Sequence, residues 1–292
     1  MEWSSIRLNV VMVLNSSATN LKFTLNNELL EIVKKYKYLG AIITTRRLTS
    51  LYTDYFTKIK QKANQKLQCI KHWGFHKDGL RPETALKLYK LLVRPILEYG
   101  AQVILYDHYY LKSKFVRTAS LNREADFAKQ LEQFQTKALK YLLGCPKSTS
   151  PTVVRLMSGI EPLSSRFDLL KLRYFWRISH GDENSIAFKV YKKRRTIFFS
   201  TRIGFIHEIF NLCCKYNVIE FWHGKLPIGV NPNQFIKNKV IKYHLKRELQ
   251  IGKNKSCAFS DVYLQNKFLY QEDFHLIKSF KTTFLAPTKQ EA

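Results

Sequence analysis

The chain has 292 residues and carries 49 Lys and Arg against 22 Asp and Glu, which gives a formal net charge of +27. A content of 45% hydrophobic and 14% aromatic residues excludes a mainly disordered protein, and only 11 Gly and 8 Pro argue against a loop-rich sandwich. The charge favours a nucleic-acid partner, because a basic field attracts phosphates and gains affinity from counterion release. A basic surface that only aids solubility, or one that meets an anionic membrane, remains the alternative.

Residues 1–47 predict a small β element. In "LKFTLNNELLEIVKK", apolar and polar residues alternate on both sides of Asn26 and Asn27. Because Asn tolerates positive φ, this pattern predicts a hairpin. The following "YKYLGAIIT" predicts one short strand, in which Gly40 permits close backbone approach.

Residues 48–180 predict helices. The first helix spans "SLYTDYFTKIKQKANQKLQCIKHW", and its apolar face is expected to hold Tyr52, Phe56, Ile59, Ala63, Leu67 and Ile70. The second begins at Pro82, a residue suited to a helix start, and it contains Pro95, which should kink the helix or start a new one. Arg94 and Glu98 can pair across one turn. The expected core residues of this segment are Leu88, Leu91, Leu92, Ile96, Leu97 and Ile104.

Two further helices follow. One has the stripe Phe127, Leu131, Phe134, Ala138, Tyr141 and Leu142, and it should end at Gly144 and Pro146. The next spans "PLSSRFDLLKLRYFWRISHG", with Ser164 or Ser165 as its expected N-cap and Gly181 as its stop.

Residues 181–292 mix aromatic-rich helical runs with "KVYKKRRT", which we interpret as a basic loop. The predicted fold class is mainly α with a small β-hairpin or strand element at the N-terminus (α+β), arranged as a multi-helix bundle. Three regions are expected: 1–47 as the β element, 48–180 as the helical bundle, and 181–292 as a basic helical region.

The cysteines indicate the compartment. Five cysteines without regular spacing form no disulfide framework, which favours a reducing, intracellular compartment, with nucleus and cytoplasm not distinguished. The first residues carry an acid, Glu2, and too short an apolar run for a signal peptide. No stretch is long and apolar enough to cross a bilayer, so no membrane partner is expected.

No catalytic or metal-binding pattern is visible. Two-metal chemistry needs carboxylates held together, yet the chain contains no adjacent pair of aspartates. The spacing of Cys69, His72 and His76 lacks a second ligand pair for zinc, and the group of Cys213, Cys214, His207 and His223 is no better spaced. No phosphate-binding glycine-rich loop occurs. We therefore predict no catalytic residues and no metal ligands.

The basic stretches are better indicators of a partner. "KIKQKANQK", "KSTS" with Arg155, "KVYKKRR" and "KNKVIKYHLKR" are each able to contact phosphates, while interleaved aromatic residues can stack on bases. A solvated helix face is the alternative for any one of them. The predicted binding residues are Lys58, Lys60, Lys62, Lys66, Arg194 and Arg195.

Several motifs in order carry a family resemblance. "YKYLGAIIT", the basic helix, "GLRPETALKLYKLLVRPILEYGAQV", "LEQFQTKALKYLLGCPKSTSP" and "SGIEPLSSRFDLLKLRYFWRI" follow one another. In this order they resemble the C-terminal part of non-LTR (LINE-like) retrotransposon reverse transcriptases, over about residues 1–180. Asn9 matches one position of the palm segment that follows the catalytic strand of that family, although the family's lysine is missing there.

The resemblance implies the end of a palm, a thumb and a connecting region. It implies a primer-grip-like role for Tyr38, Leu39 and Gly40. The family's catalytic Tyr-x-Asp-Asp turn, which binds Mg²⁺, precedes this part, and no such turn is present in the chain. We therefore expect a truncated RNA-directed DNA polymerase that lacks catalysis and cofactor, and that holds RNA or an RNA–DNA hybrid through phosphate contacts. A stand-alone helical protein-interaction module without a nucleic-acid role is the alternative.

Overall fold

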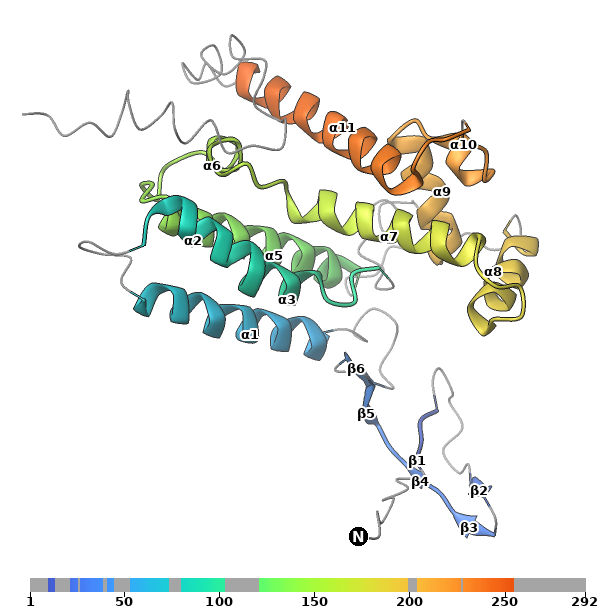
Figure 1. Cartoon of the computed structure of the whole chain (residues 1–292). Coiled ribbons are helices and arrows are strands. Elements are labelled where there is room, and N and C mark those ends of the chain that lie inside the picture. Colours follow the sequence, from blue (N-terminus) through green and yellow to red (C-terminus); the bar gives the residue numbers. More distant parts are fainter. Residues whose placement is uncertain are drawn as a thin grey trace, which may run out of the picture. The chain divides into compact units, whose positions relative to one another are not determined.

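The computed structural model describes residues 10–13, 22–25, 27–38, 41–44, 53–73, 80–102, 121–198, 204–226 and 228–254 (Figure 1). They belong to two compact units, Met1–Gln61 with Tyr106–Lys129, and Lys62–Leu105 with Gln130–Ala292. Most of the described residues are helical, and strands occur only towards the N-terminus. The predicted fold class, mainly α with a small β element, is confirmed. The division into three regions stays a prediction.

The predicted asparagine hairpin is present. Strands β2 (Thr24–Leu25) and β3 (Glu28–Leu29) pair antiparallel, with Leu25 opposite Glu28. Between them Asn27 has a φ of 66°, the left-handed conformation that asparagine tolerates better than most residues. A second pair, β1 (Val10–Val11) with β4 (Glu31–Ile32), is parallel.

The single strand predicted over "YKYLGAIIT" is wrong. The structure has two strands, β5 (Lys35–Tyr38) and β6 (Ala41–Thr44), which pair antiparallel with Tyr38 opposite Ala41. Only Leu39 and Gly40 separate them, and these two lie outside the described residues. A two-residue connection that contains glycine is a common sequence signal for a hairpin, and the expectation of one strand overlooked that signal.

Helix α1 (Thr53–His72) follows the predicted periodicity. Its residues up to Gln61 belong to the first unit and those from Lys62 to the second. The predicted apolar face is confirmed for its described members, since all of them are buried: Phe56, Ile59, Ala63, Leu67 and Ile70. Tyr52 lies outside the described residues.

The proline-containing segment divides into three consecutive pieces. Helix α2 (Pro82–Leu88) begins at the predicted proline, a π-helical turn η2 (Tyr89–Val93) follows, and α3 (Arg94–Glu98) begins just before Pro95. The Arg94 N–H donates to the Tyr89 carbonyl, five residues back. Proline has no N–H and its ring crowds the preceding turn, so a wider turn before it relieves that crowding. Pro95 thus starts a new helical element, as predicted.

The π-helical turn also changes which residues are buried. Tyr89, Val93, Leu97 and Ala101 are fully buried and recur every four residues. Leu97 was predicted correctly, but Leu91 is 69% exposed, so its assignment to the core is wrong. A wide turn adds residues per turn, and it rotates the buried face away from the position that an uninterrupted α-helix gives. Ile104 lies outside the described residues.

Helix α5 (Leu121–Leu142) ends where the glycine predicts. Gly144 has a φ of 68°, the Gly144 N–H donates to the Tyr141 carbonyl, and the Cys145 N–H donates to the Lys140 carbonyl. This left-handed ending satisfies the last carbonyls of the helix. The short helix α6 (Pro151–Ser158) follows, and Gly159 ends it in the same way with a φ of 59°.

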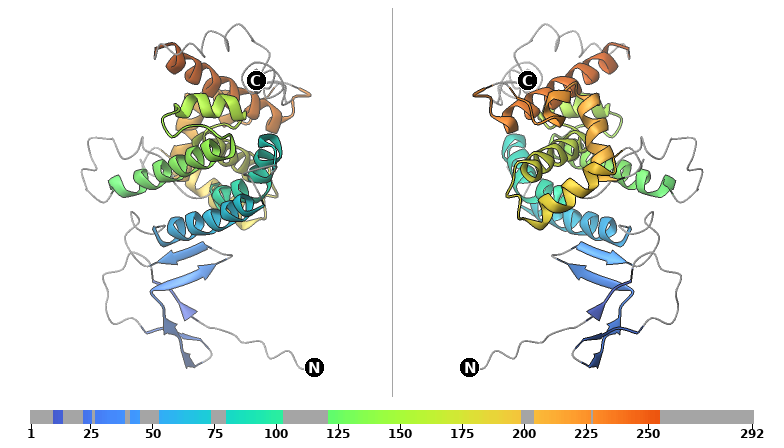
Figure 2. Two further views of the ribbon diagram at one scale, coloured as in Figure 1. Left: turned by 90° about the vertical axis from the view of Figure 1, so that its left-hand side faces the viewer. Right: turned by 90° about the vertical axis from the view of Figure 1, so that its right-hand side faces the viewer.

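The last helices share a core with α7 (Leu163–Ser179). They are α8 (Ile186–Thr196), α9 (Phe205–Lys215), α10 (Ile219–Trp222) and α11 (Pro232–Asn254) (Figure 2). At the centre Phe175 of α7 stacks on Trp222 of α10 with ring centroids 5.5 Å apart. The buried residues of this cluster are Leu169, Leu172, Phe175, Tyr191, Ile206, Ile209, Leu212, Cys213, Tyr216, Val218, Phe221, Trp222, Ile236 and Val240.

The basic loop predicted over "KVYKKRRT" is wrong, because these residues form most of α8. Ser185 caps this helix by accepting the Phe188 N–H at 3.2 Å. Phe188 and Tyr191, three residues apart, face inward and contact one another edge to face. Lysine and arginine are good helix formers, so a cap and one inward-facing pair suffice to keep a strongly basic segment helical.

Candidate nucleic-acid interface

Three of the predicted lysines lie along one line of α1. Lys58, Lys62 and Lys66 follow one another at four-residue intervals, so their side chains leave the same side of the helix. Lys62 and Lys66 are exposed and Lys58 is half-buried. The only acidic residue of α1, Asp54, lies one turn before Lys58. Lys60 is exposed but leaves the opposite flank of the helix, because two residues correspond to about 200° of rotation.

The two predicted arginines of α8 have different surroundings. Arg194 is exposed to solvent. Arg195 is half-buried, donates a hydrogen bond to the Tyr191 hydroxyl, and lies over the Trp222 ring with its guanidinium carbon 4.8 Å from the centroid. Arg195 therefore covers the aromatic core, while Arg194 is open to a ligand.

The predicted primer-grip residues fall at the β5–β6 hairpin. Tyr38 is the last residue of β5 and pairs with Ala41. Leu39 and Gly40 lie outside the described residues.

Six acidic side chains in the described part of the second unit form ion pairs, chiefly with basic residues of other helices. They are Glu98, Glu132, Glu161, Asp168, Glu208 and Glu248. Each is buried or half-buried. These six carboxylates therefore neutralise cations within the fold, and among the described residues of this unit the exposed lysines and arginines outnumber the exposed acids Asp182, Glu183 and Glu220.

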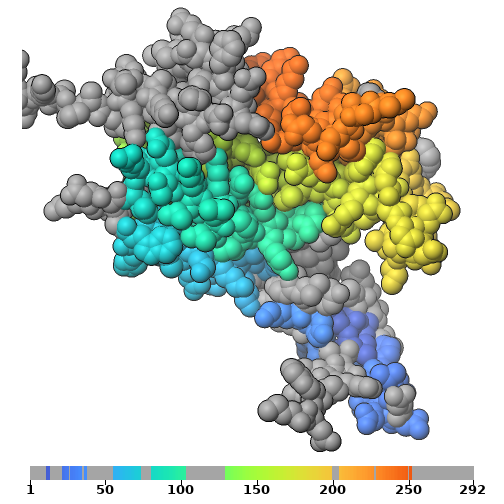
Figure 3. All heavy atoms as spheres, in the orientation of Figure 1, coloured from blue at the N-terminus to red at the C-terminus, as the bar shows by residue number. Residues whose placement is uncertain are grey.

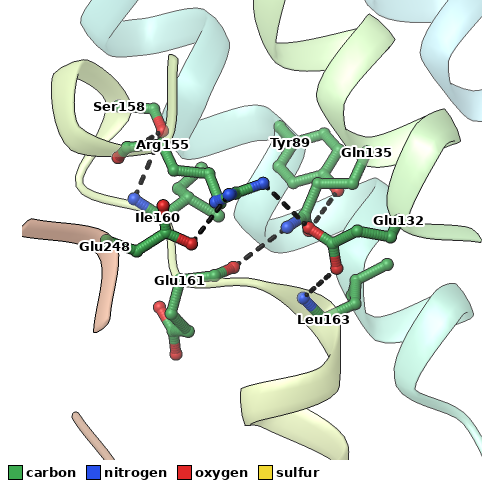
Figure 4. Close-up of polar contacts among 9 residues, drawn as sticks. All are labelled: Tyr89, Glu132, Gln135, Arg155, Ser158, Ile160, Glu161, Leu163 and Glu248. Atoms are coloured by element: carbon green, nitrogen blue, oxygen red, sulfur yellow. Dashed lines mark hydrogen bonds and ion pairs between the residues drawn. The ribbon is translucent and has the colours of Figure 1, made fainter. Parts of the chain in front are cut away.

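Arg155 of α6 is the centre of one such group (Figure 4). Its Nη1 lies 3.4 Å from Glu132 Oε1 and its Nη2 lies 2.7 Å from Glu248 Oε1, so it joins α5 to α11. Only 12% of its side chain is exposed. Arg155, which the sequence offered as one possible phosphate contact, is instead held by two carboxylates in the structure.

Glu132 also closes the start of α7 (Figure 4). The Leu163 N–H donates to Glu132 Oε2 at 2.7 Å. The expected N-cap, Ser164 or Ser165, is wrong: both lie inside α7, and Pro162 precedes it without a side-chain cap. Burial raises the pKa of Glu132, although Arg155 and the backbone N–H groups of Leu163 and Ser164 act in the opposite direction. The carboxylate of Glu132, from a neighbouring helix, thus caps the N-terminus of α7, a role that was expected of a local serine.

Gln135 links the π-helical turn to the same region. Its side-chain oxygen accepts the Tyr89 hydroxyl at 2.9 Å, and its side-chain nitrogen donates to the Glu161 carbonyl at 2.9 Å (Figure 4). Tyr89 and Gln135 are both fully buried, so this pair satisfies polar atoms that burial would otherwise leave without partners. Burial raises the pKa of Tyr89, which keeps the phenol neutral as a donor.

Glu98 has a stronger partner than the one predicted within its own helix. Arg94 lies 3.3 Å away, as the four-residue spacing indicates. Arg166 of α7 also reaches it with two hydrogen bonds, of 2.8 and 3.0 Å, in a bidentate arrangement. Glu98 therefore ties α3 to α7.

A second polar group joins α7, α9 and α11. Asp168 accepts the Lys215 ammonium at 2.6 Å and the Tyr216 hydroxyl at 2.5 Å. The Tyr216 oxygen lies 2.9 Å from His244 Nε2. Because the single hydroxyl proton goes to the carboxylate, His244 Nε2 carries the proton and donates to Tyr216. Burial, with Lys215 nearby, lowers the pKa of His244 to about 4, so the imidazole is neutral at pH 7.

Lys171 of α7 and Glu208 of α9 form an ion pair within the C-terminal core, with side chains 1% and 3% exposed. A buried pair of this kind contributes little net stability, because desolvation offsets the attraction, but loss of one partner leaves an uncompensated charge. Sequence reasoning missed this pair, as it missed Arg155 with Glu248, because no local spacing marks contacts between residues so distant in sequence.

The described residues contain no group of three or more His, Cys, Asp or Glu that is placed to hold a metal ion. The four described cysteines, Cys69, Cys145, Cys213 and Cys214, are free thiols. Burial raises the pKa of Cys213 to about 12, so this thiol stays protonated. None of the helices in the described part of the chain is long and apolar enough to span a membrane.

Comparisons with protein-family models, with curated proteins and with solved structures gave no significant match to the chain. The resemblance to reverse transcriptases therefore rests on the residues quoted above.

Proposed function

We propose that the chain binds RNA or an RNA–DNA hybrid through phosphate contacts, as a segment related to the thumb of non-LTR retrotransposon reverse transcriptases. The observation that carries the proposal is the separation of charge in its helices. Six described carboxylates of the second unit lie in buried or half-buried ion pairs, while Lys62, Lys66 and Arg194 are exposed. Cations that no carboxylate neutralises are free to replace the counterions of a phosphate backbone, which gives affinity with little sequence preference.

The proposal is restricted to binding. The motifs that resemble the family belong to its thumb and connecting region, whose contribution is to hold the template and primer. The family's Mg²⁺ chemistry needs carboxylates that lie together and share the metal ions. In the second unit, the described carboxylates that form ion pairs do so with arginine and lysine.

The test is a salt titration of binding to a labelled RNA–DNA hybrid by fluorescence anisotropy. The wild type should lose affinity steeply as salt rises. The variant Lys58→Gln, Lys62→Gln, Lys66→Gln should bind about tenfold more weakly at low salt, and the slope of log affinity against log salt should fall by about two. Lys87→Gln, Lys137→Gln, Lys225→Gln removes the same charge from exposed lysines elsewhere and serves as the matched control.

The outcomes separate the hypotheses. If the wild type fails to bind at low salt, the proposal is wrong. If the control triple variant weakens binding as much as the α1 variant, the α1 line is not the contact surface. Mg²⁺-dependent primer extension by the purified chain would contradict the restriction to binding.

One observation favours a second candidate, a protein-docking role for α8. Ile186 and Val190 lie one turn apart and are 81% and 55% exposed, beside the basic residues of the same helix. Two apolar side chains are a small patch, so this candidate is secondary. Failure to bind any nucleic acid in the titration above would favour it.

A further inference from the structure

The outward side of α11 is a regular basic stripe. Lys239, Lys242 and Lys246 recur at intervals of three and four residues, so they project from one side of the helix, with Tyr243 at its edge. All four are exposed. The inward side of the helix holds Ile236, Val240, His244 and Glu248, each buried. We call Lys239, Lys242, Tyr243 and Lys246 the α11 stripe; in Figure 3 helix α11, in orange, lies at the surface of the molecule.

Charge on α11 is divided between its two sides. Glu248 is the only acidic residue of the helix, and it is turned inward, where it binds Arg155 at 2.7 Å. The outward side therefore holds cations without a carboxylate of the same helix among them. At a rise of about 1.5 Å per residue, the three lysines extend over about 10 Å in a nearly straight line. A straight line of cations suits one strand of phosphates.

An aromatic ring accompanies the lysines and has a rigid support. Tyr243 is 38% exposed and meets Tyr216 edge to face, with centroids 5.1 Å apart. Tyr216 is itself fixed by its hydrogen bonds to Asp168 and His244. An exposed ring on a fixed support beside cations is the arrangement on which unpaired bases stack.

We infer that the α11 stripe is a binding surface for single-stranded nucleic acid, in which Lys239, Lys242 and Lys246 contact successive phosphates and Tyr243 stacks on an unpaired base. The inference rests on the proposed function in that both require a nucleic-acid ligand. It goes beyond that function because it specifies a single-stranded ligand and a second binding surface. This surface lies in a region outside the family resemblance. Bases within a duplex are already stacked on one another and cannot reach a side-chain ring, so the tyrosine discriminates against duplexes.

The experiment compares two probes, an oligouridine of about 12 nucleotides and a blunt RNA duplex of about 12 base pairs, by fluorescence anisotropy. Tyr243→Leu should weaken oligouridine binding about tenfold and leave duplex binding within about twofold. Tyr243→Phe should retain the wild-type affinity, because stacking does not need the hydroxyl group. Tyr99→Leu changes another exposed tyrosine and should affect neither probe.

The lysines give an independent readout. Lys239→Gln, Lys242→Gln, Lys246→Gln should reduce the slope of log affinity against log salt for oligouridine by about two, since each single-strand phosphate contact contributes about 0.7. Circular dichroism melting of every variant checks that the fold is kept. If Tyr243→Leu does not fold, the lysine variant and its salt slope still test the α11 stripe.

The possible failures are distinguishable. If the wild type binds neither probe nor the RNA–DNA hybrid, the proposed function fails and this inference fails with it. If the wild type binds with a steep salt dependence, but neither Tyr243→Leu nor the lysine variant alters oligouridine binding, the α11 stripe is not the surface and the proposed function stands. A Tyr243→Leu variant that weakens duplex and oligouridine binding equally would overturn the stacking role.

Discussion

His244 shows how a single buried residue makes the fold sensitive to pH. It is 5% exposed, donates to Tyr216, and is surrounded by Asp168 of α7, Lys215 of α9, Arg155 of α6 and Arg247 of its own helix. Burial and the nearby cations outweigh the attraction of Asp168 and lower its pKa to about 4. The folded protein therefore keeps this imidazole neutral under conditions in which the unfolded chain protonates it.

The sign of the pH effect follows from linkage. Because the folded pKa lies below the unfolded value of 6.5, the contribution of His244 to stability is complete above pH 6.5 and is lost as pH falls towards 4. Between pH 7 and about pH 4.5 the loss amounts to about 2 kcal/mol. Urea unfolding of the wild type and of the His244→Gln variant measures this loss of stability. The side-chain amide of the glutamine can donate to Tyr216 but does not titrate.

Carboxylates also titrate in this pH range and change the stability of both proteins. The effect of His244 is therefore the difference between the wild type and His244→Gln. The stability of His244→Gln should fall less than that of the wild type over the same interval, by about 2 kcal/mol. Parallel curves for the two proteins would show that the imidazole does not stay neutral in the fold.

At the scale of elements, the start of α7 depends on a different helix. Glu132 of α5 accepts the Leu163 N–H and opposes Arg155, so Glu132→Ala removes both a cap and one side of an ion-pair group. We expect a loss of about 3 kcal/mol in the free energy of unfolding. Glu132→Gln keeps an oxygen acceptor for the N–H group, and burial already disfavours the charge, so it should cost about 1 kcal/mol or less.

Ser164→Ala is the matched control for the cap. Ser164 is exposed inside α7 and makes no capping contact, so its removal should change stability by less than about 0.5 kcal/mol. Chemical denaturation of the three variants measures these differences. A Ser164→Ala variant that loses as much stability as Glu132→Ala would restore the serine cap expected from the sequence.

The elements that periodicity controls were predictable, and those that depend on distant contacts were not. The buried face of α1, the start at Pro82 and the end at Gly144 follow from local spacing and from proline and glycine chemistry. Leu91 was misplaced because one π-helical turn shifts the register of everything around it. The "KVYKKRRT" helix was missed because charge obscured the inward-facing Phe188 and Tyr191.

The candidate site divides in the same way. The lysines on α1 and Arg194 were proposed from composition and spacing, and their full or partial exposure agrees with that proposal, since exposed basic residues need no tertiary contact to be basic. The sequence could not distinguish Arg155 and Arg195 from these exposed residues. Arg155 is withdrawn from the surface by Glu248, 93 residues further along the chain, and Arg195 lies over the Trp222 ring. Burial of a charge is decided by the partner, and the partner is known only from the fold.

At the scale of the whole molecule, the chain is strongly basic, and six carboxylates in the described part of the second unit lie in buried or half-buried ion pairs. A chain with a formal net charge of +27 repels itself, and this repulsion is greatest where the cations are exposed and the carboxylates are withdrawn into pairs such as Lys171 with Glu208. Salt screens exposed charges that are separated by more than a Debye length, whereas buried pairs are screened much less. Added salt should therefore relieve the repulsion while leaving the internal ion pairs in place.

The resulting prediction concerns thermal stability in the absence of nucleic acid. Raising NaCl from about 20 to about 300 mM shortens the Debye length from about 20 to about 6 Å, and Tm should rise by about 3 °C or more as repulsion among the surface cations is screened. Circular dichroism melting measures this rise, with Lys62→Glu, Lys66→Glu as the comparison, because reversing two exposed charges should make the salt effect smaller. A Tm that falls with salt would mean that exposed ion pairs, and not the internal ones, hold the helices together.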